Sequence, residues 1–398
     1  MKKLLIGISI LTMLVGCHKD DPEEVKPERT VLIYMAAENN LTNWSGEEFA
    51  DPDIDEIKEG AKLIGNNHLV VYVDKAEDAK PYFLHFTNGD LKDSVPTTYD
   101  TQTSDPAVLE EVARNAFKDY PANSYGLVLW GHASGWMMMN DSVSYTSMAR
   151  KKAYGGDTGN NTTSSAGRTW MNIPSMAKAL SHVPHLDFIF ADCCNFMCLE
   201  SAYELRNVTD YLIGSPAEIP GVGAPYNTIV PALFDKTTFY SSIIDKYYAQ
   251  RDRGYDVPLS AIKSSEMANL ASATKTVLKA LKPNIEGDYP DMNGIIHYYY
   301  TLKFHDANDF ILNYASANDY SAWKQALDKA VVYKKMATKW QTNMSWNGYY
   351  YDFSVTDEKF GGVSMFVPQY PYSGYSQYNE DIEKMGWYYA AGYNDIGW

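Results

Sequence analysis

Two short apolar runs in this sequence end at residues that can carry out covalent chemistry. Residues 127–130 lead to His132, and residues 188–191 lead to the adjacent cysteines Cys193 and Cys194. Both runs have the length and composition of buried β-strands. A thiolate is a nucleophile whose formation a neighbouring imidazole promotes, and a histidine can then protonate the leaving amine. The two segments therefore predict acyl transfer through a covalent cysteine intermediate.

The elements that position these residues must be neighbouring strands of one parallel sheet. The interval between His132 and Cys194 (194 − 132 = 62 residues) accommodates a loop and one crossover helix, the connection that joins parallel strands. Open parallel sheets have their active sites at the carboxyl ends of the strands, so we expect the imidazole and a thiol to meet at one sheet edge. Considered separately, each residue could have a structural rather than a catalytic role. A cysteine at a strand end commonly packs in the core, and a lone histidine commonly only forms hydrogen bonds.

From Arg29 to about residue 215 the pattern alternates between strands and helices. The predicted strands are residues 31–35, 69–73, 82–86, 127–130, 186–190 and 211–215. The predicted helices are residues 55–64, 173–182, 198–206 and a helix that begins at Asp105-Pro106. Asn88-Gly89 predicts a hairpin turn. This alternation predicts an α/β fold with a mostly parallel central sheet between two layers of helices.

Two further segments have a different composition. Residues 140–171 are rich in glycine, asparagine and threonine, and we predict a long loop there that contains an exposed basic triplet at residues 150–152. Beyond about residue 240 the sequence is helical and rich in tyrosine, with one amphipathic helix predicted over residues 321–340 and a late strand over residues 360–368. Such aromatic enrichment either fills an interface between subdomains or binds sugar or peptide.

The amino terminus has the pattern of an export signal. Lys2 and Lys3 precede an apolar run at residues 4–15 that is too short to span a bilayer. The Leu-Val-Gly that precedes Cys17 resembles a bacterial lipobox, with an ordinary signal peptide as the alternative. We predict a signal peptide at residues 1–16, lipidation of Cys17, and an acidic tether at residues 17–28. The tether resembles signals that send lipoproteins of the outer membrane to the cell surface.

Charge and cysteine content exclude several classes of protein. Removal of residues 1–16 leaves a formal charge of 32 − 50 = −18, which argues against nucleic acid as a partner and is compatible with cationic peptides. Cys193, Cys194 and Cys198 are too close together to tie distant loops, so at least one is a thiol. They lack the paired spacing of structural zinc sites. We predict no metal and no cofactor, and the sequence does not reveal a calcium requirement.

The chain resembles the clostripain-like cysteine peptidases, relatives of gingipains, caspases and legumains. That family has a strand ending Trp-Asn-His-Gly-x-Gly-Trp and a later strand ending Phe-Asp-Ala-Cys, which residues 130–136 and 191–194 resemble. Further matches are residues 31–40, 199–205, 211–215, 220–226 and 362–368. The resemblance implies a caspase-like αβα sandwich at residues 29–240. Residues 241–398 then form a helical, aromatic-rich region whose late strand returns to the core.

The resemblance also implies roles for individual residues. The nucleophile is Cys194 rather than Cys193, because the family's aspartate precedes its cysteine by two positions, and His132 completes the dyad. Backbone N–H groups of Ala133 and Cys194 form the oxyanion hole. Asp192 matches an acid at the floor of a pocket that receives Arg or Lys of a peptide or protein substrate, with a turn or cap aspartate as the structural alternative.

The sequence departs from the family pattern at three positions. Ala133 replaces a glycine, Gly131 replaces an asparagine that can orient the histidine, and Val222 replaces a second pocket acid. Relatives are often cleaved between the two strands after a basic residue, which implies self-cleavage in the 150–168 loop. The candidate there is Lys152, with Arg150, Lys151 and Arg168 as alternatives. The resulting prediction is an exported cysteine endopeptidase; the alternative is a catalytically silent surface lipoprotein that binds peptide or glycan.

Overall fold

The computed structural model describes residues 26–43, 46–76, 78, 80–97, 102–138, 153–157, 159, 168–253, 256–285, 289–299, 303–340, 353–368 and 376–398. The strands are β1 (Arg29–Ala37), β2 (His68–Lys75), β3 (Tyr82–Thr87), β4 (Asp90–Pro96), β5 (Ser124–Ala133), β6 (Tyr154–Asp157), β7 (Thr169–Met171), β8 (Leu186–Asp192), β9 (Thr209–Gly214), β10 (Leu259–Lys263), β11 (His305–Asp306), β12 (Val331–Lys335) and β13 (Ser364–Met365). The α-helices are α1 (Ala50–Ala61), α2 (Pro106–Asp119), α3 (Ile173–Leu180), α4 (Leu199–Leu205), α5 (Tyr226–Ala232), α6 (Phe239–Tyr248), α7 (Met267–Ile285), α8 (Ala307–Tyr314), α9 (Ala317–Ala330), α10 (Ser376–Ile382), α11 (Gly386–Ala390) and α12 (Tyr393–Ile396). Two 3-10 helices, η1 (Ala249–Arg253) and η2 (Ser264–Glu266), flank β10.

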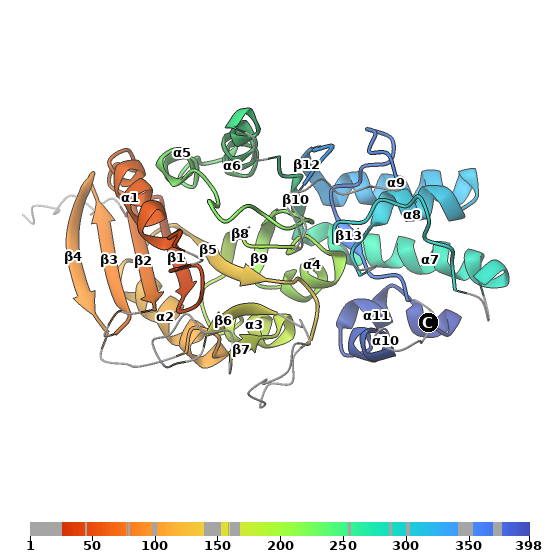
Figure 1. Ribbon diagram of the computed structural model, residues 1–398, viewed down its shortest axis with the longest axis horizontal. Coiled ribbons are helices and arrows are strands. Elements are labelled where there is room, and N and C mark those ends of the chain that lie inside the picture. Colours follow the sequence, from red (N-terminus) through yellow and green to blue (C-terminus); the bar gives the residue numbers. More distant parts are fainter. Residues whose placement is uncertain are drawn as a thin grey trace, which may run out of the picture.

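A large sheet runs across the molecule in the order β12-β10-β9-β8-β5-β1-β2-β3-β4 (Figure 1). The five central strands, β9, β8, β5, β1 and β2, are parallel to one another. Strands β3 and β4 continue one edge in antiparallel orientation, and β10 and β12 continue the other. The predicted α/β architecture with a mostly parallel centre is therefore confirmed.

Helices cover both faces of this sheet, as the buried central strands require. Side chains alternate between the faces along β1, so that Val31 and Ile33 belong to one core cluster and Leu32 and Tyr34 to the other. The first cluster includes apolar residues of α1, α5 and α6, and the second includes residues of α2, α3 and α4. Figure 1 shows these two helical layers above and below the sheet.

Local sequence signals account for the elements that were predicted correctly. Asp105 caps α2, where its side chain accepts a hydrogen bond from Ala107 N at 2.9 Å. Asn88 and Gly89 have φ angles of 54° and 79°, the left-handed pair that a two-residue hairpin requires between β3 and β4. These short-range devices explain why the first half of the sheet was predictable from the sequence.

Other segments differ from the sequence prediction. The 140–171 segment, predicted as loop, contains β6 and β7, and β6 pairs with β5. The helix predicted over residues 321–340 ends at Ala330, and β12 follows it. Residues 331–333 (Val-Val-Tyr) are β-branched or aromatic and pair with β10, so long-range pairing overrides the helical pattern. The central sheet thus extends past residue 240 into the C-terminal region.

The late strand forms a small sheet of its own. Strand β13 pairs with β11, and Ser364 N donates to Met197 O at 3.0 Å, next to a bridge between Cys198 and Ser364. This contact connects the C-terminal region to the segment that follows β8.

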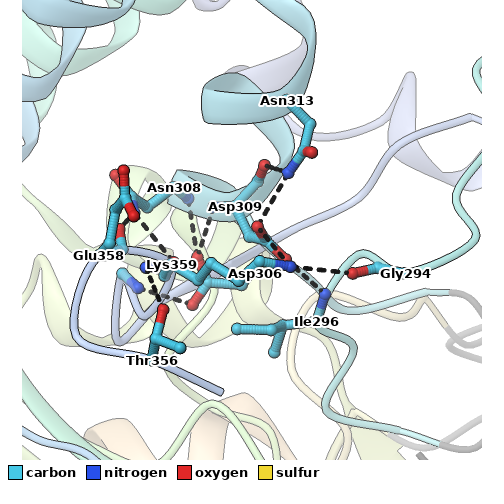
Figure 2. A network of polar contacts seen from close by, with 10 residues as sticks. Gly294, Ile296, Asp306, Asn308, Asp309, Asn313, Thr356, Glu358 and Lys359 are labelled. Carbon is cyan, nitrogen blue, oxygen red and sulfur yellow. Dashed lines mark hydrogen bonds and ion pairs between the residues drawn. The ribbon is translucent and has the colours of Figure 1, made fainter. Parts of the chain in front are cut away.

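Three buried polar residues and a half-buried lysine tie the C-terminal segments together, and we call Asp306, Asn308, Asp309 and Lys359 the C-terminal network (Figure 2). Asp309 accepts from Ile296 N at 2.8 Å, and the Lys359 ammonium lies 3.5 Å from its other oxygen. The Asn308 amide donates to the carbonyl oxygens of Glu358 and Lys359 at 2.7 and 2.9 Å. The network joins three segments that are far apart in sequence.

Residues 1–25 lie outside the described residues, so the predicted signal peptide, Cys17 and most of the tether have no structural counterpart here. Among the residues that the structure does describe, no helix is long and apolar enough to cross a membrane.

Candidate active site

The two reactive residues lie at the carboxyl ends of adjacent parallel strands. Strand β5 pairs with β8, and Trp130 lies opposite Asp192 in the register. His132 lies two residues after Trp130, and Cys194 lies two residues after Asp192. The sequence-based expectation that both would reach one sheet edge agrees with this register. The helix predicted over residues 198–206 is α4, Leu199–Leu205, which begins five residues after Cys194.

The three cysteines at this edge differ in their access to solvent. Cys193 and Cys198 are fully buried, whereas Cys194 is partly exposed. Burial raises the pKa of the Cys193 thiol well above its ordinary value, and it raises the pKa of Cys198 as well. Ile219 N donates to Cys194 Sγ at 3.5 Å. Of the three, Cys194 is the thiol that a substrate can reach.

His132 is surrounded by residues from three other segments. Its Nε2 atom lies 3.0 Å from Oδ1 of Asn40, which follows β1. The ring centroid of Trp170 on β7 is 6.3 Å from that of His132. Gly155 on β6 lies opposite His132 in the register. The β6–β7 hairpin, which the sequence pattern did not predict, therefore frames the histidine.

The glycines around His132 carry the unusual backbone angles. Gly131 and Gly135 have φ angles of 142° and 54°, whereas Ala133 is an ordinary residue of β5. A Cβ atom at Gly131 would lie 3.0 Å from Ala36 O. The change from glycine to alanine at position 133 therefore introduces no left-handed strain, and an asparagine at position 131 would be strained here.

A pocket of about 440 Å³ lies between the segment that follows β1 and the loop at residues 220–225. We call it the acidic pocket, because its lining includes Glu47, Glu48, Asp53 and Glu56. Val222 and Gln250 also line it. A pocket with several acids and few basic groups is suited to a cationic side chain.

Asp192 lies behind the acidic pocket and is not among its lining residues. Its carboxylate accepts hydrogen bonds from Ala224 N at 3.0 Å, Tyr226 OH at 2.9 Å and Tyr247 OH at 3.0 Å. Asp53 accepts from Trp130 Nε1 at 2.6 Å. Both carboxylates approach one point, because a Cβ atom at Gly223 would lie 2.9 Å from Asp192 Oδ2 and 3.3 Å from Asp53 Oδ2.

Burial raises the pKa of both acids, and the charge of one acts on the other. Burial raises the pKa of Asp53 well above its ordinary value, and the nearby Asp192 raises it further. Burial also raises the pKa of Asp192, while its three hydrogen bonds act in the opposite direction. A cationic group in the pocket would favour the ionised form of both acids.

A second acidic cluster lies at the carboxyl ends of β1, β2 and β6. Carboxylate oxygens of Glu38, Asp74 and Asp157 lie within 4.8 Å of one another, and all three residues are buried. Such a donor set has the oxygen chemistry of a calcium site. Burial, followed by the charge of Glu38, raises the pKa of Asp157 to about 6. The guanidinium of Arg168 also lies beside Asp157 and supplies positive charge to the cluster.

Of the four candidate residues for self-cleavage, the structure describes only one, Arg168. Lys152, like Arg150 and Lys151, lies outside the described residues. Arg168 is only 5% exposed and donates to Asn40 Oδ1 at 2.8 Å. A protease would have to displace Arg168 from this contact before it could cleave there.

Comparison with known proteins identifies the family. A family model described as the clostripain family, peptidase C11, matches residues 33–398. The chain belongs to the clostripain family. It is therefore a cysteine peptidase, a hydrolase that acts on peptide or protein substrates. No curated protein matches the chain significantly.

Solved structures of clostripain-family peptidases are similar over most of the chain. A secreted C11 cysteine protease from Bacteroides thetaiotaomicron, in complex with an irreversible peptide inhibitor, is 31% identical with a TM-score of 0.74. An inactive zymogen C11 protease from Parabacteroides distasonis is 28% identical with a TM-score of 0.71. The match covers 92% of this chain and 99% of each of those chains. The caspase-like αβα fold is thus confirmed.

A third structure, the secreted C11 protease iotapain from Bacteroides thetaiotaomicron, is 20% identical with a TM-score of 0.69. The match covers 92% of this chain and all of that one. At this identity the similarity supports the fold alone.

Sequence reasoning did not single out Asn40 or Asp53, and it named Arg168 only as an alternative processing site. Asn40 lies three residues beyond the end of β1 (Arg29–Ala37), and the carboxyl ends of parallel strands are where active-site residues are expected. That rule could have singled it out. Asp53 lies in a polar helix and Arg168 in a segment without periodicity, so neither had a distinguishing signal.

Proposed function

We propose that this clostripain-family peptidase is an exported endopeptidase that uses His132 and Cys194 as its catalytic dyad. Cys194 Sγ attacks the carbonyl carbon of the scissile bond and forms an acyl-enzyme, while His132 takes the thiol proton and passes it to the leaving amine. Water then hydrolyses the thioester and regenerates the thiol. The observation that carries this proposal is the partial exposure of Cys194, beside two fully buried cysteines, at the strand end adjacent to that of His132.

The direction of the Ala133 N–H supports its role in the oxyanion hole. Ser134 N donates to Ala153 O at 2.9 Å, on the side of β5 where β6 pairs. Because N–H groups of successive strand residues point to opposite edges, the Ala133 N–H is directed toward the β8 side, where Cys194 lies. We assign this donor and the Cys194 N–H to the developing oxyanion.

The acidic pocket supports a preference for Arg or Lys before the scissile bond. Asp53 is a buried acid of the pocket lining, with Asp192 behind it. Val222 also lines the pocket at the position where the family pattern has an acid. We therefore propose that Asp53, supplied by α1, takes the place of that acid, and that Asp192 contributes its charge from behind rather than by direct contact.

We also propose lipid anchoring and self-processing. The lipobox-like segment before Cys17 supports anchoring to the outer membrane and display at the cell surface. Replacement of Cys17 by Ala should release the protein from the membrane fraction, and retention there would contradict the proposal. Lys152 is the proposed self-cleavage site in the 150–168 loop, and Cys194→Ala protein should then remain a single chain.

Thiol labelling tests the dyad. A peptidyl acyloxymethyl ketone with lysine at its reactive end should label the purified protein rapidly. Cys194→Ala should abolish this labelling, and His132→Ala should slow it by about 100-fold or more, as expected for loss of a general acid–base group. Cys193→Ala is the matched control and should label like the wild type. Labelling that persists in Cys194→Ala, or a wild type that binds peptides without cleaving them, would overturn the assignment.

A further inference from the structure

The imidazole of His132 is held by two residues outside the dyad and the pocket. Asn40 Oδ1 lies 3.0 Å from His132 Nε2, and Arg168 Nη1 donates to the same oxygen at 2.8 Å. Asn40 follows β1, Arg168 precedes β7, and His132 is on β5. Three segments that are far apart in sequence therefore converge on one oxygen atom.

This arrangement fixes which nitrogen of His132 carries a proton. A guanidinium has only donors, so the atom of Asn40 that faces Arg168 must be the amide oxygen and not the amide nitrogen. That oxygen can only accept, so His132 Nε2 must carry a hydrogen. In the neutral imidazole the lone pair then resides on Nδ1, which is the atom left to accept a proton from a thiol.

Arg168 is itself firmly placed. It is 5% exposed, and the negative charge of Asp157 compensates part of the cost of burying its guanidinium. Asp157 is fixed in turn by Thr103, whose N–H and hydroxyl donate to one carboxylate oxygen at 2.5 and 2.7 Å. Asp157 ends β6, the strand that pairs with β5 at His132. The arginine is thus connected, through the same hairpin, to the strand that carries the histidine.

We propose that Asn40 and Arg168 are positioning residues that keep His132 in the tautomer with hydrogen on Nε2 and in the orientation needed for proton exchange with Cys194. The inference rests on the roles proposed above for His132 and Cys194. Arg168 orients the Asn40 amide, and Asn40 orients the imidazole. Position 131, next to the histidine, is a glycine and offers no side chain for this purpose.

Steady-state kinetics separate positioning from substrate binding. Asn40→Ala and Arg168→Met should each lower kcat by about 10- to 100-fold, with KM almost unchanged. This is the range found when a hydrogen-bond partner that orients a metal-bound histidine is removed. Asn40→Asp keeps an acceptor oxygen and should restore most of kcat. Arg168→Lys keeps the charge without the planar fork and should lie between the wild type and Arg168→Met.

The matched control is Arg29→Met. Arg29 is equally buried and donates to Leu233 O at 2.8 Å, but it begins β1 and so lies at the opposite end of the strand from Asn40. Its replacement should lower stability without lowering kcat of the folded fraction. Equal losses of kcat in Arg29→Met and Arg168→Met would show that Arg168 acts only through stability and would overturn the proposal.

Histidine tautomers provide a readout that does not need catalysis. Long-range proton–nitrogen spectra of histidine-labelled Cys194→Ala protein should show His132, assigned by its loss in a His132→Ala variant, with hydrogen on Nε2. Asn40→Ala should give a mixture of both tautomers. An unchanged pattern in Asn40→Ala would overturn the inference. If the wild type cleaves no peptide, the proposed function fails, yet this spectrum still decides the role of Asn40.

Discussion

The acidic pocket and the C-terminal network both bury aspartates, but they surround them with different partners. In the C-terminal network, Asp306 accepts from Asn308 N at 2.8 Å, Asp309 N at 3.0 Å, Gly361 N at 2.8 Å and Tyr298 OH at 2.5 Å. Its neighbour Asp309 has the Lys359 ammonium at 3.5 Å (Figure 2). In the acidic pocket, Asp53 accepts from Trp130 and faces a second carboxylate, Asp192.

The difference separates a structural role from a binding role. Backbone N–H groups and a lysine stabilise the carboxylates of the C-terminal network, so their removal leaves several buried donors unsatisfied. Asp192 is also well supplied with donors, but Asp53 lies beside an open pocket and the charge of Asp192 raises its pKa, so a cation from outside would relieve that repulsion. Burial alone does not distinguish the two sites; the identity of the facing groups does.

The largest expected effect is on stability. Asp306→Ala removes the acceptor of three backbone N–H groups and a tyrosine hydroxyl, and we expect it to lower the free energy of unfolding by about 4 kcal/mol. Urea denaturation measures this loss, while activity per folded molecule should persist. Asp328→Ala, which removes an exposed partner of Lys324, is the control and should cost under about 0.5 kcal/mol. Similar losses in both variants would contradict the structural role of the network.

The second prediction concerns specificity. Asp53→Asn keeps the acceptor for Trp130 but removes the charge, and kcat/KM for peptides with Lys or Arg should fall about 100-fold, or about 2.7 kcal/mol. Peptides with glutamine at that position should be affected much less. Glu59→Gln, on the exposed side of α1 beside Lys62, should leave both rates unchanged. A uniform loss over all substrates would instead assign Asp53 a structural role.

The third prediction is a pH dependence of binding. Because burial raises the pKa of Asp53 and Asp192, the pair holds a proton more readily than exposed aspartates do, and a cationic substrate must displace it. The KM for a lysine peptide should therefore fall as pH rises. If binding releases one proton, the fall is about 10-fold for each pH unit. A glutamine peptide should show little dependence. Calorimetry in buffers of different ionisation enthalpy should detect the released proton, and a proton count of zero would exclude the linkage.

The smallest expected effect is an increase in the free energy of unfolding, whereas the first prediction is a decrease. The pKa of Asp53 is higher in the folded protein than in the unfolded chain, so its favourable contribution is complete below the unfolded pKa and disappears as pH rises through the folded pKa. Asp53→Asn should thus stabilise the protein by about 1 kcal/mol at about pH 8, with little gain near pH 4. Thermal unfolding at both pH values measures this. Destabilisation at high pH would mean that the ionised Asp53 carboxylate contributes net stability, which would contradict the proposed repulsion.

The sequence was sufficient to predict the parallel strands and the position of His132 and Cys194 just after the ends of two adjacent strands. Apolar runs, the Asp105 cap and the Asn88-Gly89 turn are local signals, and the chemistry follows from the rule about strand ends. The β6–β7 hairpin and β12 were missed because their pairing partners are distant in the sequence. The roles proposed for Asp53 and Arg168 were not predicted for a related reason. They depend on Asp192 and Asn40, which only the fold brings near them.

The order of the strands has a consequence for a chain cut within the 150–168 loop. In the main sheet, β1 to β5 all lie on one side of the β5–β8 contact, and β8, β9, β10 and β12 all lie on the other. A single cut would therefore divide the sheet into two contiguous halves, one with the histidine and one with the cysteine. The mature enzyme would then be a heterodimer held by strand pairing. Separately expressed halves should reconstitute activity by complementation, with a rate that depends on the concentration of both.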